Sequence, residues 1–154
     1  MAKAYGRMEW AFLEGMMLRL GFFREWVKLM MLCVTTVRYT IMVNEQAGGV
    51  VVPTRGLWQG DPLSPYLFII CVDGLSLLLQ NSQQHGLIHG CRVARGAPAI
   101  SHMFFAYDIL LFFKANEHEG GKISRCLIVY EGLSGQAINY HKSSITFSHN
   151  TAGG

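Results

Sequence analysis

The spacing of apolar residues changes along this chain, and that change restricts the folds it can adopt. Within residues 23–34, large apolar side chains recur every three or four positions, with charged residues on the opposite side, as in an amphipathic helix. From residue 35 to residue 43, apolar and β-branched residues alternate with their neighbours, as in a strand with one buried face. The chain therefore combines helices with strands.

Helical spacing also occurs in three other places, each with a recognisable start or end. The predicted helices cover residues 8–20, 64–80 and 117–133. Ser64 and Pro65 suit an N-cap and a first helical position. Gly21 and Gly135 suit the position just past a helix end.

Strand-like segments account for most of the remaining chain. The predicted strands are residues 35–43, 50–52, 100–105, 109–113 and 143–147, with a turn over 44–49. The third and fourth of these are largely apolar and close in sequence, which predicts a hairpin of buried strands. Helices mixed with antiparallel strands place the chain in the α+β class. We expect one domain over residues 1–150 and a disordered tail over 151–154.

The composition limits the classes of protein that fit. With 154 residues, of which 51% are hydrophobic and 15% charged, the chain can bury a core, and this excludes disorder as its main state. The high apolar share also indicates surface that is normally covered by something else. The net charge of +3 is small for a nucleic-acid binder, so charge alone does not indicate one.

Cysteine spacing and the N-terminus bear on location. No run of about 18 consecutive apolar residues occurs, so no membrane partner is expected, and no signal-peptide core follows the N-terminus. The cysteines, at positions 33, 71, 91 and 126, form no C-x-x-C pair, so neither a disulfide framework nor a zinc ribbon is expected. We expect an intracellular protein, nuclear or cytoplasmic and not secreted, with no defined protein partner.

One loop has an unusual content of glycine and proline. It runs from Arg55 to Phe68 and leads into the helix that begins at Ser64. A helix N-terminus attracts negative charge, and exposed backbone around Gly60 could lie against a nucleotide or a template strand. An ordinary strand-to-helix connection fits the same residues, so the pattern leaves both interpretations open.

A second segment carries a candidate metal ligand. Asp108 lies between the two apolar runs that predict a hairpin, and a carboxylate at a hairpin tip is well placed to hold a metal ion. A lone aspartate in a turn is also common for purely structural reasons. The residues alone again leave both interpretations open.

Together these segments resemble the reverse transcriptases of non-LTR (LINE-type) retrotransposons, especially those of plants. In that family a loop reading R-Q-G-D-P-L-S-P-Y-L-F precedes a hairpin reading F-A-D-D. This chain has the loop from Arg55 to Phe68 and then Phe105-Ala106-Tyr107-Asp108. Three further segments are similar to family motifs: Lys3–Trp10 to K-A-Y-D-R-V-E-W, Ile41–Leu57 to I-x-V-N-G…P-x-R-G-L, and Gly135–Ser144 to S-G-Q-x-I-N-x-x-K-S.

The resemblance implies a fold, a cofactor and partners. The fold would be a partial right-hand polymerase palm with part of the fingers, and the partners would be an RNA template and a DNA primer. In intact relatives, carboxylates hold two Mg²⁺ ions about 3.5–4 Å apart for nucleotide transfer. The catalytic and metal-binding residue that remains is Asp108. The residues that match the family's nucleotide- or template-binding loop are Arg55, Gln59, Gly60, Asp61, Ser64 and Pro65.

The chain departs from the family where the chemistry takes place. Tyr107 replaces the first aspartate of F-A-D-D, Gly6 replaces the acid of K-A-Y-D, and the upstream metal-binding aspartate would fall just before Met1. One of three expected metal ligands therefore remains. We expect a truncated, inactive enzyme that binds no Mg²⁺ productively. Trp58 replaces a family arginine, and it either stacks on a base or reflects drift.

Two other functions stay open. The chain could be a residual, non-catalytic RNA- or DNA-binding module that uses the loop over residues 55–65, in which case its binding should depend on salt. It could instead be a domesticated protein-interaction fragment that docks a partner through exposed apolar surface, in which case one defined partner should co-purify with it.

Overall fold

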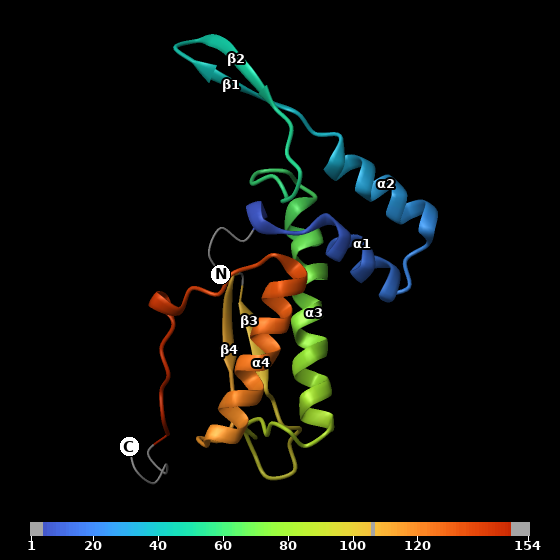
Figure 1. The fold of residues 1–154 in the computed structure, drawn as a ribbon. Helices are drawn as coiled ribbons and strands as arrows, with labels where there is room; N and C mark the ends of the chain where they lie inside the picture. Colours follow the sequence, from blue (N-terminus) through green and yellow to red (C-terminus); the bar gives the residue numbers. More distant parts are fainter. Residues whose placement is uncertain (1–4, 106, 149–154) are drawn as a thin grey trace. The chain divides into compact units, whose positions relative to one another are not determined.

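The computed structural model describes residues 5–105 and 107–148, and these form two compact units. We call residues 5–71 the N-terminal unit and residues 72–148 the C-terminal unit. Helix α3 (Ser64–Gln84) begins in the first unit and continues into the second. Figure 1 shows the elements of both units in chain order. The tail for which disorder is predicted, residues 151–154, lies outside the described residues.

Two helices open the N-terminal unit where their spacing predicts them. After a short 3-10 helix come α1 and α2, so that the elements are η1 (Tyr5–Arg7), α1 (Trp10–Arg19) and α2 (Arg24–Thr35). Gly21 has a φ of +87°, which fits its predicted place beyond a helix end. Helix α1 buries Leu13, Met16 and Met17, whereas α2 buries Val27 alone.

Part of the apolar face of α2 is exposed. Phe23, at the N-cap, is 83% exposed and Trp26 is 36% exposed, whereas Met30, Met31 and Val34 are half-buried. Phe22 stacks on Trp26, with ring centroids 4.7 Å apart. The helical spacing is therefore confirmed, but Val27 is the one residue of the predicted face that other described residues bury fully.

A hairpin follows α2, formed by the antiparallel strands β1 (Tyr39–Val43) and β2 (Gln46–Val51). Asn44 and Glu45 form its turn, and both have positive φ angles, 50° and 63°. Two positive φ angles match the turn to the twist of paired strands. The turn predicted over 44–49 was therefore too long, and the strand predicted over 50–52 was too short.

The strand predicted over 35–43 was wrong at its start, because α2 extends to Thr35 and β1 begins at Tyr39. The hydroxyls of Thr35 and Thr36 each donate a hydrogen bond to the carbonyl four residues earlier, at 2.8 and 2.6 Å. Threonine favours strands by its side-chain shape. Here its hydroxyl instead satisfies carbonyls of the last helical turn.

Helix α3 runs four residues further than predicted, to Gln84. Asp61 fixes its start: Oδ1 of Asp61 accepts the N–H of Leu63 at 2.8 Å, and its carbonyl accepts the N–H of Ser64 at 3.1 Å.

By length and composition α3 could cross a membrane, although no such segment was expected. Half of its most apolar stretch is buried inside the protein, so this is weak evidence for a membrane.

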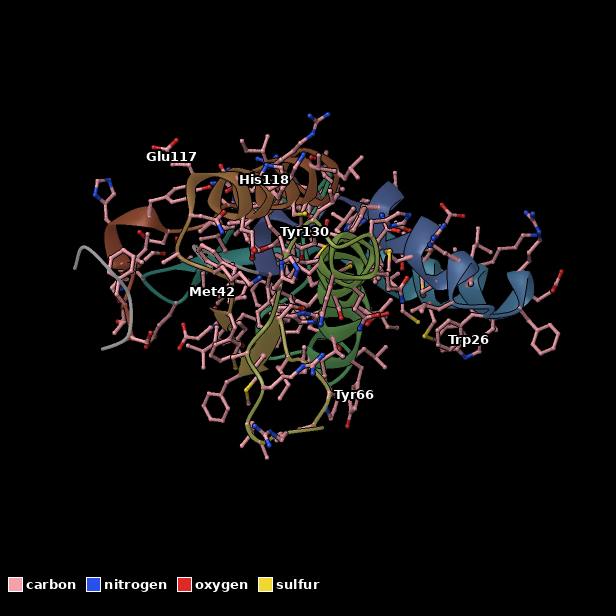
Figure 2. The ribbon with its side chains drawn as sticks, turned by 90° about the horizontal axis from the view of Figure 1, so that it is seen from below. Trp26, Met42, Tyr66, Glu117, His118 and Tyr130 are labelled. Atoms are coloured by element: carbon pink, nitrogen blue, oxygen red, sulfur yellow. The ribbon has the colours of Figure 1, made fainter. Side chains whose placement is uncertain are left out.

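In the C-terminal unit, β3 (His102–Phe105) pairs with β4 (Asp108–Leu111) in antiparallel register, which confirms the predicted hairpin. Helix α4 (Glu117–Ser134) ends at Gly135, whose φ is +72°, also as predicted. Tyr130 is fully buried in this unit (Figure 2). Other buried side chains of this unit, from α3, α4 and the loop between α3 and β3, include Leu75, Leu79, Ile88, Ile123 and Leu127.

Two expectations for this unit were wrong. Strands β3 and β4 are not buried on both faces, because Met103, Phe105 and Leu110 point to the exposed side. The strand predicted over 143–147 does not form: after a short 3-10 helix, η2 (Tyr140–Lys142), residues 143–148 are exposed and have no regular structure. Alternating residues need a neighbouring strand to form a ladder, and the described residues offer this segment none.

A buried carboxylate ties the start of α4 to two loops. Glu119 is 3% exposed. It accepts the N–H groups of His89 and Lys114 at 2.9 and 3.0 Å, and its Oε1 lies 2.8 Å from Nδ1 of His89. Burial by itself would raise the pKa of Glu119, but these hydrogen bonds and the His89 ring outweigh it and lower the pKa. Asn116 caps the same helix by accepting the N–H of Glu119 at 2.8 Å.

Replacing Glu119 by glutamine is expected to destabilise the protein by about 1–3 kcal/mol at neutral pH, because two N–H groups lose a charged acceptor. The pKa of Glu119 is lowered in the folded state. Its contribution is therefore complete above the pKa of an unfolded glutamate, about 4.3, and is lost as the pH falls through the folded-state pKa. Urea unfolding across this range measures the effect. The exposed neighbour Glu117, changed to glutamine, is the control, and a loss at neutral pH that persists in acid would contradict the assignment.

The exposed face of the β3–β4 hairpin predicts self-association. Replacing Phe105 and Leu110 by lysine is expected to reduce light scattering and dye binding, because exposed apolar strands pair and aggregate. The free energy of unfolding should change by no more than about 0.5 kcal/mol at such surface positions. Leu75→Ala, in the core, is the contrasting change and should cost about 2–5 kcal/mol. Unchanged scattering in the lysine variant would refute a role for this face.

Candidate functional site

The loop that precedes α3 is anchored to the start of the N-terminal unit by backbone hydrogen bonds. The N–H of Gly56 donates to the carbonyl of Met8, and the N–H of Leu57 to that of Tyr5, both at 2.8 Å. The indole Nε1 of Trp10 donates to the carbonyl of Gly56 at 2.7 Å. Three bonds across more than 45 positions of sequence hold this loop in one place, so its side chains are presented in a fixed arrangement.

Glycine is required at one of two facing positions in this anchor. Gly56 has a φ of +89°, and a Cβ built there would lie 2.9 Å from the carbonyl oxygen of Gly6 and 3.0 Å from its Cα. A Cβ at Gly6, in contrast, would meet no atom within 4 Å. The close approach therefore excludes side chains at position 56 and permits them at position 6.

The predicted binding residues of the loop take different positions. Arg55 pairs with Glu9 at 3.3 Å, with both side chains about half exposed, so the pair contributes at most about 1 kcal/mol. Asp61 and the buried Ser64 line a shared hollow. The remaining predicted residues, Gln59, Gly60 and Pro65, are exposed and do not line it.

The hollow is small, about 10 Å³, which is room for about one water molecule. Tyr39 and Trp58 are part of its lining, and the ring of Tyr39 stacks on the indole of Trp58, with centroids 4.1 Å apart and planes 21° from parallel. Burial and the nearby Asp61 carboxylate both raise the pKa of Tyr39. Sequence reasoning missed Tyr39 as part of this site. The alternating pattern of residues 35–43 places Tyr39 on a strand. It does not indicate that Tyr39 stacks on Trp58, which is 19 residues away.

At the other candidate site, Asp108 is the first residue of β4 and lies opposite Phe105 on β3. Its neighbours on the same exposed face of the hairpin are Met103, Phe105 and Leu110, all apolar. Tyr107 precedes it and is 42% exposed, while Ala106 lies outside the described residues. The hairpin therefore presents one carboxylate beside apolar side chains.

A second acid of this unit lies near the opposite end of the hairpin. Asp73 on α3 is close enough to His102 to raise its pKa, although burial lowers that pKa by more. His102 is three residues from Phe105, a distance of about 10 Å along a strand. Asp73 is therefore not grouped with Asp108.

His102 belongs to a polar network that sequence reasoning also missed. Its Nε2 lies 2.8 Å from Oγ of Ser76 and its Nδ1 lies 3.0 Å from Oγ of Ser101. Gln80 donates to the same Ser76 hydroxyl at 3.1 Å. With its hydroxyl accepting from Gln80, Ser76 can donate its proton to His102. The network fixes β3 on α3, and we assign it a structural role.

Across the described residues, no three side chains of histidine, cysteine, aspartate or glutamate come together in a way that could hold a metal ion. A pair of Mg²⁺ ions requires several carboxylate oxygens at one place. The donors present at the β3–β4 hairpin do not fit such a pair.

Comparison with known proteins identifies a family and a relative. Residues 1–152 match the family model described as reverse transcriptase (RNA-dependent DNA polymerase). Over 67 residues, the chain is 49% identical to an uncharacterized mitochondrial protein of Arabidopsis thaliana, an alignment that covers 44% of this chain and 55% of that protein. The chain thus spans about half the length of this curated relative. Because the family match covers nearly the whole chain, the protein belongs to the reverse transcriptase (RNA-dependent DNA polymerase) family.

Proposed function

We propose that this chain derives from the reverse transcriptase of a non-LTR retrotransposon and does not itself polymerise DNA. Residues 1–150 would correspond to part of a right-hand palm with part of the fingers, and the β3–β4 hairpin to the metal-binding hairpin of the palm. The observation that carries the proposal is the hairpin itself, where Tyr107 precedes Asp108 and the facing strand position is Phe105.

Electrostatics explains why one acid is too few. Two divalent ions about 4 Å apart repel each other by about 4 kcal/mol even at the dielectric constant of water, four times the value for unit charges. Carboxylates offset that repulsion by charge and by direct oxygen contacts. Asp108 supplies one carboxylate, and the tyrosine at position 107 adds no second one. A Mg²⁺ pair at this hairpin would therefore remain largely uncompensated.

Partners and location follow as further parts of the proposal. Members of the family act on nucleic acid, and for this chain we propose an RNA template and a DNA primer as the ancestral partners. We also propose an intracellular location, nuclear or cytoplasmic. The four cysteines are free, as is usual for proteins of these reducing compartments. Arg55, Gln59, Gly60, Asp61, Ser64 and Pro65 would be the remnants of the nucleotide- or template-binding loop.

A second candidate function, nucleic-acid binding without chemistry, is favoured by the anchored loop. The bonds from Gly56, Leu57 and Trp10 hold it without any metal ion. Trp58, half exposed on this loop, is available to a ligand. Binding could therefore survive the loss of catalysis, since the two properties depend on different residues.

The decisive experiment for inactivity is primer extension on an RNA template with Mg²⁺ or Mn²⁺. The unmodified chain is expected to give no product above a protein-free background. Template-directed incorporation by the highly purified chain would overturn the proposal.

Metal binding tests the physical reason separately. Tyr107→Asp is expected to tighten Mn²⁺ binding by about ten-fold or more, because ligand charge sets the affinity of oxygen sites. Water-proton relaxation by Mn²⁺ gives the measurement. Tyr107→Asn, which keeps a turn-forming residue but adds no charge, should leave the affinity unchanged. Equal tightening by both variants would show that shape, and not charge, limits the site.

A further inference from the structure

We propose that Tyr39 and Trp58 form a platform on which an unpaired base of single-stranded nucleic acid stacks. The inference deepens the second candidate function, nucleic-acid binding without chemistry, and rests on it. It assigns a role to Trp58, which departs from the family loop, and to Tyr39, which lies outside that loop. The ligand group is the base, not the phosphates of a nucleoside triphosphate.

The geometry of the pair suits this role. The rings are nearly parallel, 21° apart, with centroids separated by 4.1 Å. Trp58 nevertheless remains 51% exposed. Because Tyr39 covers one face of the indole, we infer that the exposed part of the ring is its edge and its other face. An indole held on one face and open on the other presents a rigid surface for stacking.

The size of the hollow decides where the base lies. The space lined by Tyr39, Trp58, Asp61 and their neighbours has a volume of about 10 Å³, which is far too small for a nucleobase. A base therefore cannot enter it and would lie on the open face of Trp58. Such a contact needs no pocket, and it accepts any base because every base has a π-face.

Charge distinguishes a base from a phosphate at this position. The Asp61 carboxylate is close enough to Tyr39 to raise its pKa, so it also opposes an approaching phosphate. Arg55, the basic residue of the same loop, is already paired with Glu9. The N-terminal unit as a whole is nearly neutral, with six basic residues against five acidic ones, a difference of one. The basic residues are Arg7, Arg19, Arg24, Lys28, Arg38 and Arg55, and the acidic ones are Glu9, Glu14, Glu25, Glu45 and Asp61.

The first test separates bases from phosphates. The full chain is titrated with an oligothymidylate of about eight nucleotides, within the usual site size, and with an abasic oligonucleotide of the same length. We expect saturable binding of the first and at least ten-fold weaker binding of the second. The slope of the logarithm of the binding constant against the logarithm of the salt concentration should be about −0.7, which corresponds to one phosphate contact. Equal binding of the abasic strand, or competition by thymidine triphosphate that exceeds competition by thymidine, would overturn the proposal.

The second test uses two tryptophans in similar surroundings. Trp26 (Figure 2) is also partly exposed and also stacked on an aromatic ring, that of Phe22. Trp58→Ala is expected to weaken oligothymidylate binding about ten-fold, the size of one stacking contact, and Trp26→Ala less than two-fold. Equal losses in both variants would overturn the proposal.

Fluorescence of the phenylalanine variants distinguishes loss of the stacking contact from a folding defect in the alanine variant. Trp58→Phe keeps an aromatic ring, so it should retain binding within about three-fold while losing most of the fluorescence quenching caused by the oligonucleotide. Trp26→Phe should keep that quenching. Quenching that persists in Trp58→Phe would overturn the platform. Failure of the unmodified chain to bind either strand would overturn the nucleic-acid-binding function as well, so the two failures are distinguishable.

Discussion

The C-terminal unit depends on the way in which the second half of α3 is covered. Leu75 and Leu79 are fully buried, and the polar residues among them make specific bonds to the rest of the unit. Ser76 contacts His102 at the start of β3, and Ser82 lies 3.3 Å from Sγ of Cys126 on α4. Apolar burial provides most of the stability, while such buried polar pairs fix which partner lies where.

That arrangement decides which hairpin residues can have a chemical function. The inner face of β3 and β4 packs against the rest of the unit, whereas the side chains of the outer face are exposed. A ligand would therefore bind at the outer face. Among the described residues of that face, the neighbours of Asp108 are the apolar Met103, Phe105 and Leu110. The stability of the unit and the proposed loss of catalysis are therefore separate matters, since the fold does not require the carboxylates that the chemistry requires.

Much of the fold followed from local patterns, and the errors have physical causes that hydrophobic periodicity does not reveal. Helices α1, α2 and α4 were predicted because apolar spacing and the glycines at 21 and 135 are local signals. The strand predicted over 143–147 does not form because pairing depends on distant neighbours, and the strand predicted from residue 35 begins later because Thr35 and Thr36 complete the preceding helix. Thr35 satisfies a helix carbonyl, and residues 143–148 find no partner strand among the described residues.

The sites show the same division. The family motifs identified Asp108 and the loop residues by their order in the chain. Tyr39 and Trp58 are 19 positions apart, and Glu119 is 30 positions from His89 although only five from Lys114. No single-sequence pattern encodes such contacts, because each depends on the packing of whole elements.

The contact between Gly6 and Gly56 makes evolutionary change unequal on its two sides. In a chain no longer selected for catalysis, residue 6 could be substituted many times. A Cβ at this position would meet no atom within 4 Å, so substitution would change the stability of the fold little. Residue 56 has no such freedom, since any larger group would push the two backbones apart. A change at residue 6 thus leaves the fold unaffected, whereas glycine at position 56 is required by shape alone, whether or not the chain is an active enzyme.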